Sequence, residues 1–464
     1  NHLGGLDRAT FEYNFPGWTM KSQRYHATSA ATVTVLEEYE YDHAGRITKM
    51  WHTLDGGTRT LLSATNYNEL GQVVENNLHS TNNGASFLQS VDYRYNIRGW
   101  LTHINNSTLS VDANNDDSND LFGMQLVYNE ETPSVGTNSV VKQYSGNIAS
   151  VKWKTNNLKD TPQERIYGFH YDSKDRLSKS FYAANNSGAW NGELGMYDED
   201  NLTYDDNGNL NTLRRYAKIS GAKAAMDDLS YNAAGTTSTG NKLLTVEDSG
   251  NDYLGFADIT PGVTEFEFDD NGNLESDLNS AFTTVEYNYI NLPSKVLIDE
   301  GTSNETSVEF TYDASGYLLK KVYKKAGVVE SEYTVDYVNG IQYRGGALAV
   351  VFTPQGRATK YNGAWEYEYF LTDHLGNTRV VFGNVHDADV YKATMETYYA
   401  SDEEDDFKKL STTRWTDPAY NHTARSTDVP SPDRSAKLNG SVSGLEVGPG
   451  LMIPIVSGDK LKMS

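Results

Sequence analysis

Cysteine is absent from this chain of 464 residues. Its absence excludes disulfide bonds, thiol catalysis and metal sites built from thiolate ligands. It does not exclude export from the cell, because a large β-array buries enough surface to be stable without covalent links.

A basic excess and a long apolar run are also missing. The 63 acidic residues outnumber the 39 basic residues, so the formal net charge is −24. Such a chain lacks the positive charge that attracts nucleic acids or anionic membranes. No stretch approaches the roughly 18 apolar residues that a membrane-spanning helix requires. These absences exclude several partners without indicating a function.

The two ends of the sequence lack recognisable terminal signals. The chain begins Asn1-His2-Leu3, with no initiator methionine and no signal-peptide core. At the other end, residues 451–456 and 460–464 have a strand-like pattern that stops at Ser464. We therefore expect a segment of a longer polypeptide, with any targeting signal or effector domain outside it.

Aromatic residues, in contrast, are abundant: the chain has 32 Tyr, 15 Phe and 7 Trp. Disordered chains are poor in such residues, because they bury too little apolar surface to offset the entropy of ordering. Tyrosine suits half-buried strands, with the ring inward and the hydroxyl at the wet edge. The composition therefore predicts an ordered protein rich in β-structure.

The most informative feature is a repeated motif that reads aromatic, Asp or Asn, two variable residues, often Gly, one more residue and an apolar residue. Tyr41-Asp-His-Ala-Gly-Arg-Ile47 is one copy, and several neighbouring copies begin 25 to 28 residues apart. The copies begin at Tyr41, Tyr67, Tyr95, Tyr171, Tyr204, Phe268 and Tyr312, with weaker copies at Tyr231 and Tyr287; their turn residues include Asp42, Gly45, Gly71, Asp205, Gly208, Asp269, Gly272, Asp313 and Gly316.

This spacing predicts a β-hairpin at each copy. The Asp or Asn side chain bonds the backbone two residues on, and the Gly accepts the positive φ of a type I turn followed by a bulge. Alternating segments such as 37–41, 285–289 and 366–370 read as strands. Because a lone hairpin is marginally stable, we expect the hairpins to pair edge to edge in one long antiparallel strip. The one faint helical signal, Gly221–Leu229, predicts two helical turns.

These repeats resemble the YD repeats of the RHS family, which includes the shell-forming subunits of insecticidal toxin complexes and the teneurins. The more specific segment is Tyr369-Phe-Leu-Thr-Asp-His-Leu-Gly-Asn-Thr-Arg-Val-Val381, which is similar to the core motif that closes the repeat region of that family. Segments 119–128 and 144–153 resemble the Bacteroidota versions. The core residues that the resemblance marks as structural are Tyr369, Asp373, His374, Leu375, Gly376, Asn377 and Arg379.

The resemblance implies an all-β strip that winds spirally into a hollow shell, export from the cell, and a variable C-terminal toxin held in or beside the shell. We expect an N-terminal strand or linker region at 1–34, the repeat shell at 35–383, and an acidic linker with a truncated β-module at 384–464. The acidic run Asp402–Asp406 belongs to the expected linker.

The sequence departs from the family's self-cleaving element, which reads Asp-Pro-x-Gly-Leu. Here Asp417-Pro418 is followed by Ala-Tyr, without Gly-Leu. We therefore do not carry the autoprotease over, and we expect no catalytic residue and no enzyme. The ten histidines are scattered and give little support to a metal site or to histidine-based catalysis.

Acidic turns raise the question of Ca²⁺, which prefers clustered oxygen ligands. Asp205–Asn209 and Asp269–Asn273 lack the distal Glu of an EF-hand loop, so local turn hydrogen bonds are the favoured interpretation. Asp112–Asp116 has the opening alternation of such a loop, but position six is Asp117 and position twelve is Gly123. A solvated acidic loop is favoured there, and we expect no cofactor and no metal, with Ca²⁺ at acidic turns as the alternative.

Three functions compete at this point. The first is a secreted shell that encloses or presents a C-terminal effector. The second is a surface adhesin or gliding-motility protein exported by the type IX secretion system, whose partners are the translocon and a cell-surface glycan or protein. The third is an enzyme such as a glycoside hydrolase with paired carboxylates, for which 63 acidic residues give no selective support. We expect a secreted or outer-surface location.

Overall fold

The computed structural model describes residues 1–384 except 30, 131–133, 157–161, 220, 233–240, 252–253, 303–304, 326–332 and 362, together with the backbone of four two-residue strands beyond them. Contacts divide the chain into a first unit, Asn1–Asn384, and a second unit, Val385–Ser464. The described residues form strands and turns, with no helix among them. No helix that is long and apolar enough to cross a bilayer occurs among the described residues.

The first unit consists of two antiparallel sheets of 17 and 12 strands. The first sheet contains β1 Leu6–Tyr13, β2 Thr19–Ala27, β3 Thr32–Tyr41, β4 Ile47–Leu54, β5 Thr60–Tyr67, β6 Val73–Ser80, β7 Gln89–Tyr95, β8 Leu101–Ile104, β9 Phe122–Val127, β10 Ser150–Thr155, β11 Arg165–Tyr171, β12 Leu177–Asn186, β13 Ala189–Gly192, β14 Glu199–Tyr204, β15 Leu210–Ile219, β16 Ala222–Tyr231 and β17 Val246–Asp248.

The second sheet contains β18 Phe266–Phe268, β19 Leu274–Asp277, β20 Phe282–Tyr287, β21 Pro293–Ile298, β22 Thr306–Tyr312, β23 Leu318–Lys325, β24 Tyr333–Val338, β25 Ile341–Arg344, β26 Ala347–Thr353, β27 Gly356–Tyr361, β28 Ala364–Thr372 and β29 Thr378–Gly383. In the second unit, β30 Phe407–Lys408 pairs with β33 Gly450–Leu451, and β31 Arg414–Trp415 pairs with β32 Ser435–Ala436.

Consecutive strands of the first unit pair as antiparallel neighbours, except that β14 pairs with β12 instead of β13 and that β17 and β18 belong to different sheets. The predicted strip of hairpins is confirmed. The helical prediction at Gly221–Leu229 is wrong, because this segment lies in β16. Alanine favours a helix, but the segment pairs along its length with β15, and two cross-strand ion pairs fix that register. These pairs are Arg214 with Asp228 and Arg215 with Asp227, at 2.6 and 2.7 Å.

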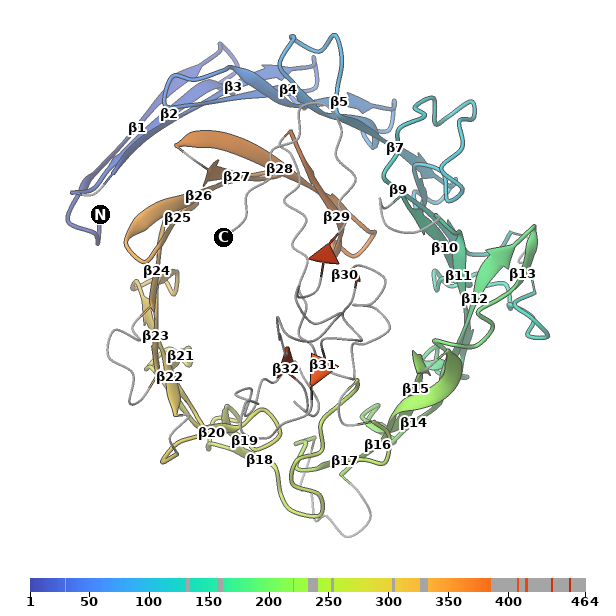
Figure 1. Ribbon diagram of the computed structural model, residues 1–464. Helices are drawn as coiled ribbons and strands as arrows, with labels where there is room; N and C mark the ends of the chain where they lie inside the picture. Colours follow the sequence, from blue (N-terminus) through green and yellow to red (C-terminus); the bar gives the residue numbers. More distant parts are fainter. Residues whose placement is uncertain are drawn as a thin grey trace, which may run out of the picture. The chain divides into compact units, whose positions relative to one another are not determined.

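The strip bends round through its middle strands and returns on itself, so that β24–β29 lie along the concave side of the first strands (Figure 1). One cluster of buried residues joins the two layers. Its members come from residues 33–151 on one side and 341–371 on the other. We call these paired layers, β1–β10 and β24–β29, the overlap.

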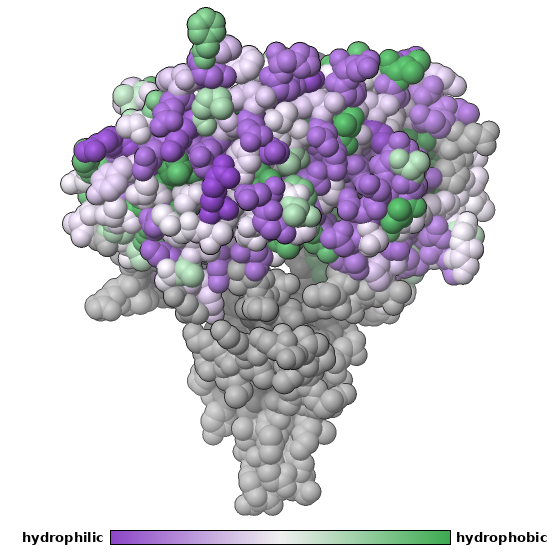
Figure 2. Space-filling model, turned by 90° about the horizontal axis from the view of Figure 1, so that it is seen from above, coloured by the Kyte–Doolittle hydropathy of each residue, from purple (hydrophilic) through white to green (hydrophobic). Residues whose placement is uncertain are grey.

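The exterior is polar, with isolated apolar side chains. Figure 2 shows a mainly hydrophilic face on which hydrophobic residues appear singly. Several of the most exposed apolar residues lie in hairpin turns, including Phe15, Leu70, Ile97, Tyr289 and Leu375. Scattered apolar residues are normal on protein surfaces, so they do not by themselves mark an interface.

Candidate functional site

The hairpin turn that begins at Tyr41 shows how each repeat folds. Asp42 Oδ1 accepts the backbone N–H groups of Ala44 and Arg46, at 2.8 and 3.0 Å. Gly45 has a φ of 82°, in the left-handed region that a side chain disfavours. A bulge follows, because Tyr41 pairs with Ile47 after a register shift at Glu40.

The same turn recurs at other predicted copies, while the turn after Tyr231 lies outside the described residues. Asp205 and Asp269 accept both the backbone and the side-chain N–H groups of the Asn four residues later. Asp313 accepts the backbone N–H groups of Ser315 and Tyr317. Because these oxygens serve the turns, local hydrogen bonds account for the acidic motifs. Positive φ angles occur at Gly71, Gly208, Gly272 and Gly316.

The repeat tyrosines link each hairpin to the one before it. The Tyr41 hydroxyl donates to Thr19 O, and the Tyr67 hydroxyl donates to Ile47 O. In each case the acceptor is the first residue after the preceding turn. The bond explains tyrosine rather than phenylalanine at this position, since only tyrosine carries the donor. The same bond joins Tyr95 to Val73, Tyr204 to Leu177, and Tyr287 to Leu274.

Arginine makes a matching link in the forward direction. Arg46 Nε donates to Asp42 Oδ2, while its guanidinium lies 4.6 Å from the centre of the Tyr67 ring in the next repeat. Arg176 does the same with Asp172 and Tyr204, whose ring centre is 4.4 Å away. These contacts stack successive turns along one edge of the strip.

One repeat was missed in the sequence. Tyr13-Asn-Phe-Pro-Gly-Trp-Thr19 forms the same turn: Asn14 Oδ1 accepts Trp18 N at 2.8 Å, and Gly17 has a φ of 92°. The turn lies within 1–34, which we expected to be a strand or linker region. Its signal was present, because Tyr13 stands 28 residues before Tyr41, which is within the repeat spacing.

The hairpin of β28 and β29 carries the core motif. Asp373 Oδ1 accepts Leu375 N and Asn377 N, both at 2.9 Å, while Oδ2 accepts Arg379 Nε at 2.8 Å. Burial alone would raise the pKa of Asp373, but these hydrogen bonds outweigh it and lower the pKa. Gly376 has a φ of 84°. The turn is therefore tied by one fully buried carboxylate.

Two core-motif residues differ from the remaining ones. Leu375 is exposed at the turn. His374 Nδ1 is buried with no hydrogen-bond partner in the described part of the chain. Burial lowers the pKa of His374.

The overlap contains an arrangement that the sequence interpretation missed. Three histidines of the outer layer meet three tyrosines of the inner layer. His52 Nδ1 lies 2.9 Å from Tyr367 Oη, and His79 Nδ1 lies 3.0 Å from Tyr369 Oη. The third pair is His26 Nε2 with Tyr343 Oη, at 2.8 Å. These three hydrogen bonds, which we call the His–Tyr seam, tie strands separated by about 300 positions along the sequence.

Burial keeps two of the three seam histidines, His52 and His79, neutral. Burial, with a smaller effect of Arg24, lowers the pKa of His52 to about 4, and burial lowers the pKa of His79. His52 Nε2 is buried with no hydrogen-bond partner among the described residues. A doubly protonated His52 would therefore have an N–H group without an acceptor. Burial also raises the pKa of Tyr367, whose hydroxyl therefore keeps its proton. The arrangement joins the two layers by buried hydrogen bonds, two of them made by neutral histidines, while His26 also contacts the Asp7 carboxylate.

The sequence contained a signal for the seam. His26, His52 and His79 stand 26 and 27 residues apart, which is the spacing of the repeat. They therefore occupy equivalent places on β2, β4 and β6. The ten histidines are not all scattered, as we had interpreted them, because these three follow the repeat.

The acidic loop expected at Asp112–Asp116 is exposed at Ala113, Asn114 and Asp116, whereas neighbouring side chains of the loop 105–121 are buried. Asn115 and Asp120 are buried, at 0% and 3% exposure, and Asn115 Nδ2 donates to Asp120 Oδ2 at 2.8 Å. Asp112 is held by Arg94, with both carboxylate oxygens 2.9 Å from Nη2. The loop therefore folds back on its own side chains. Beyond residue 384, Asp402–Asp406 and Asp417-Pro418 lie outside the described residues, as does most of the expected β-module.

No protein-family model matches the chain, and no curated protein matches it. Among solved structures, the chain is similar to the crystal structure of TcdB2-TccC3 without its hypervariable C-terminal region, with 14% identity and a TM-score of 0.52. The match covers 82% of this chain and 19% of that chain. A porin-like protein from Bacteroides uniformis matches over 70% of this chain with 12% identity, but the TM-score of 0.18 is too low to bear on the fold. The first likeness shows a shared β-strip fold.

Proposed function

We propose that this chain is a structural protein of the RHS type, whose β-strip forms the wall of a shell that encloses or presents a C-terminal effector. The observation that carries the proposal is the His–Tyr seam. A strip that served only as a linear spacer would not need its last strands to pack on its first. The three buried pairs instead hold the spiral to its own beginning.

The effector is supported by two observations. The chain continues for 80 residues as a second unit, Val385–Ser464, after the closing hairpin. The solved structure with the similar fold is described as lacking a hypervariable C-terminal region. In this proposal the protein is exported and acts outside the cell or on its outer surface, with the type IX translocon as its partner during export.

Electron microscopy and proteolysis test the shell. Particle images of the purified chain should show a curved wall that returns on itself, and a flat or unwound ribbon would reject the proposal. Trypsin should cleave the segment 385–464 more slowly in the folded chain than in the same peptide alone. Equal cleavage rates would mean that the shell does not protect residues 385–464. Enclosure of the effector would then be rejected, and only its presentation would remain in the proposal.

The proposal includes the absence of enzymatic activity, because the self-cleaving element is not recognisable around Asp417. Intact-mass spectrometry after prolonged incubation should find a single uncleaved chain. A specific cut after residue 384 would overturn this part of the proposal.

A surface adhesin or gliding-motility protein is the second candidate. Exposed aromatic side chains at the turns favour it, because such rings can stack on sugars: Phe15, Tyr289 and Tyr317 are 104%, 90% and 73% exposed. A glycan array with the chain and with a triple variant, Phe15→Ser, Tyr289→Ser and Tyr317→Ser, tests it. A deletion strain with unchanged attachment and spreading would argue against this candidate.

A further inference from the structure

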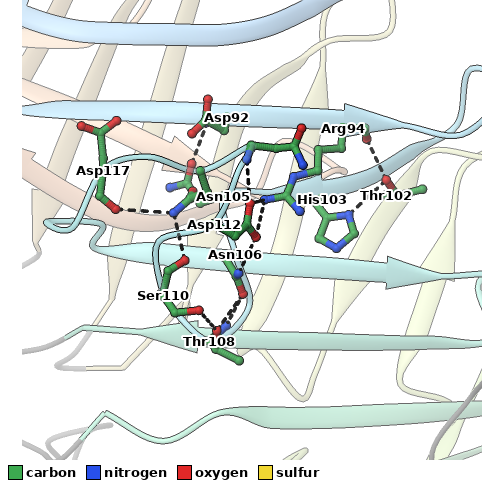
Figure 3. A network of polar contacts seen from close by, with 12 residues as sticks. Asp92, Arg94, Thr102, His103, Asn105, Asn106, Thr108, Ser110, Asp112 and Asp117 are labelled. Atoms are coloured by element: carbon green, nitrogen blue, oxygen red, sulfur yellow. Dashed lines mark hydrogen bonds and ion pairs between the residues drawn. The ribbon is translucent and has the colours of Figure 1, made fainter.

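Three aspartates from different parts of the chain converge beside the overlap. Asp92 lies on β7, while Asp116 and Asp117 lie on the loop between β8 and β9. One carboxylate oxygen of each lies within 4.8 Å of the others. Figure 3 shows Asp92 and Asp117 approaching from the strand and from the loop.

The loop is held in place without using these three carboxylates. Asn105 Oδ1 accepts Asp92 N at 2.7 Å, and Asn105 Nδ2 donates to Phe122 O at 2.9 Å. Asn106 Nδ2 donates to Asp112 Oδ2 at 2.9 Å, beside the Arg94 ion pair (Figure 3). Neighbouring residues therefore set the positions of the three aspartates, and none of these hydrogen bonds uses their carboxylate oxygens.

Asp92 is the residue that needs a ligand. It is only 9% exposed, and its Oδ2 is buried with no hydrogen-bond partner among the described residues. A buried carboxylate without a partner is strongly unfavourable unless it is neutralised. Asn115 Oδ1, in the same loop, is also buried without a partner in the described part of the chain. Two unsatisfied oxygens thus belong to one small region.

Among the described residues, no positive side chain is paired with Asp92. The charged groups that act most strongly on Asp92 are Glu75, Asp116, Asp117 and Asp120, all of them acidic. Arg94, two positions along the same strand, is already paired with Asp112. Burial, followed by the charge of Glu75 and of the loop aspartates, raises the pKa of Asp92 to about 7. The three clustered carboxylates and their acidic neighbours therefore favour a cation over an anion at this place.

We propose that Asp92, Asp116 and Asp117 bind Ca²⁺, with the Asn115 side-chain oxygen as a further candidate ligand. Oxygen ligands alone favour Ca²⁺ or Mg²⁺ over transition metals. Ca²⁺ accepts six to eight ligands in flexible geometry, which suits a set split between a strand and a loop, whereas Mg²⁺ requires near-ideal octahedral geometry. The site differs from an EF-hand, whose ligands come from one continuous loop, because Asp92 supplies a ligand from the strand β7. The bound ion would pin the loop 105–121 to β7.

Thermal unfolding of the full chain tests the site, with EDTA, CaCl₂ or MgCl₂ at pH 7.5. CaCl₂ at 100 times the dissociation constant should raise the unfolding temperature of the wild type by about 3 °C. The increase should disappear in Asp92→Asn and in Asp116→Asn, the second of which changes an exposed position. Asp206→Asn, in the exposed turn 205–209, is the matched control and should keep the full increase.

The EDTA condition separates lost binding from misfolding. Without calcium, Asp92→Asn should unfold at a higher temperature than the wild type. The substitution removes a buried negative charge that lies among other negative charges. The proposal is overturned if the wild type shows no calcium-dependent increase up to 10 mM, if Asp92→Asn and Asp116→Asn keep the increase, or if MgCl₂ gives the same increase at equal concentration. Calcium titration calorimetry, with one site in the wild type and none in Asp116→Asn, provides the second measurement.

Discussion

The overlap and residues 189–325 share one repeat but bury very different numbers of hydrophobic side chains. We call residues 189–325, from β13 to β23, the arc; its described strands form a single layer (Figure 1). The described residues of the arc contain four buried hydrophobic side chains: Leu229, Val246, Val285 and Val322. The overlap contains a cluster of twenty buried residues. The repeat forms the strip, and the packing of its last strands on its first strands forms this cluster of twenty buried residues.

This difference has an energetic meaning. Full burial of a large apolar side chain contributes about 1.5–3 kcal/mol, so most hydrophobic stabilisation resides in the overlap. The arc depends more on its hydrogen-bond ladder and on cross-strand ion pairs such as Arg215 with the fully buried Asp227. We therefore expect equivalent substitutions to have unequal effects in the two regions.

Removing a seam tyrosine should have the largest effect. Tyr369→Ala removes a ring that is 1% exposed and leaves buried His79 without its hydroxyl partner. We expect a loss of about 3–5 kcal/mol in the free energy of unfolding, measured by urea denaturation. Tyr312→Ala, at a half-buried repeat position of the arc, should lose about 1–2 kcal/mol.

Tyr369→Phe is the control for this pair, because it keeps the ring and removes only the hydroxyl. It should lie between the wild type and Tyr369→Ala. If Tyr369→Ala and Tyr312→Ala destabilise the chain equally, the distinction between the overlap and the arc is wrong.

Acid should weaken the overlap and spare the arc. The folded-state pKa of His52 lies at about 4, below its ordinary value of 6.5, so the unfolded chain takes up this proton first. Stability is therefore complete above pH 6.5 and declines as the pH falls toward 4, by about 3 kcal/mol for His52 alone. The described residues of the arc include no histidine.

Hydrogen exchange measured at pH 7 and pH 5, corrected for intrinsic rates, should show a selective loss of protection in β4, β6 and β28. The double variant His52→Gln, His79→Gln should remove most of that difference, since glutamine does not titrate. Equal loss of protection in β20–β23 of the wild type would show that the seam is not the acid-sensitive element.

The local part of this comparison could be predicted from the sequence, and the layered part could not. Asp42 and Gly45 specify their turn through bonds within five residues, so the motif alone predicts it. The pairing of His52 with Tyr367 depends instead on how far the strip curves over about 300 residues. Small twists at each hairpin add up to that curvature, so the sequence of a single repeat does not predict it.

The same reasoning explains why the helix predicted at Gly221–Leu229 is wrong. The alanines of 222–225 favour a helix locally, but pairing with β15 decides their conformation. Contacts with a neighbouring strand therefore override the local preference of this segment.

The closing turn should be more sensitive than an arc turn of the same design. Asp373→Ala removes the acceptor of two backbone N–H groups and of Arg379, and we expect a loss of about 2–3 kcal/mol. Asp313→Ala removes two backbone bonds and no arginine pair, so a loss of about 1 kcal/mol is expected. Both follow from denaturation midpoints, and a larger effect at Asp313 would contradict the ranking.

The smallest effect should be equal in the two regions, which makes it the sharpest check on the repeat itself. Tyr95→Phe and Tyr204→Phe each remove one hydroxyl that donates to the preceding hairpin, at 2.9 and 2.7 Å. Each should lose about 0.5–1.5 kcal/mol, the net value of one such bond. Because Tyr95 belongs to the overlap and Tyr204 to the arc, equal losses would show that hairpin-to-hairpin linkage is a property of the repeat. A clearly larger loss at Tyr95 would mean that the second layer also strengthens the turns beneath it, and the overlap would then stabilise the strip by more than its buried core.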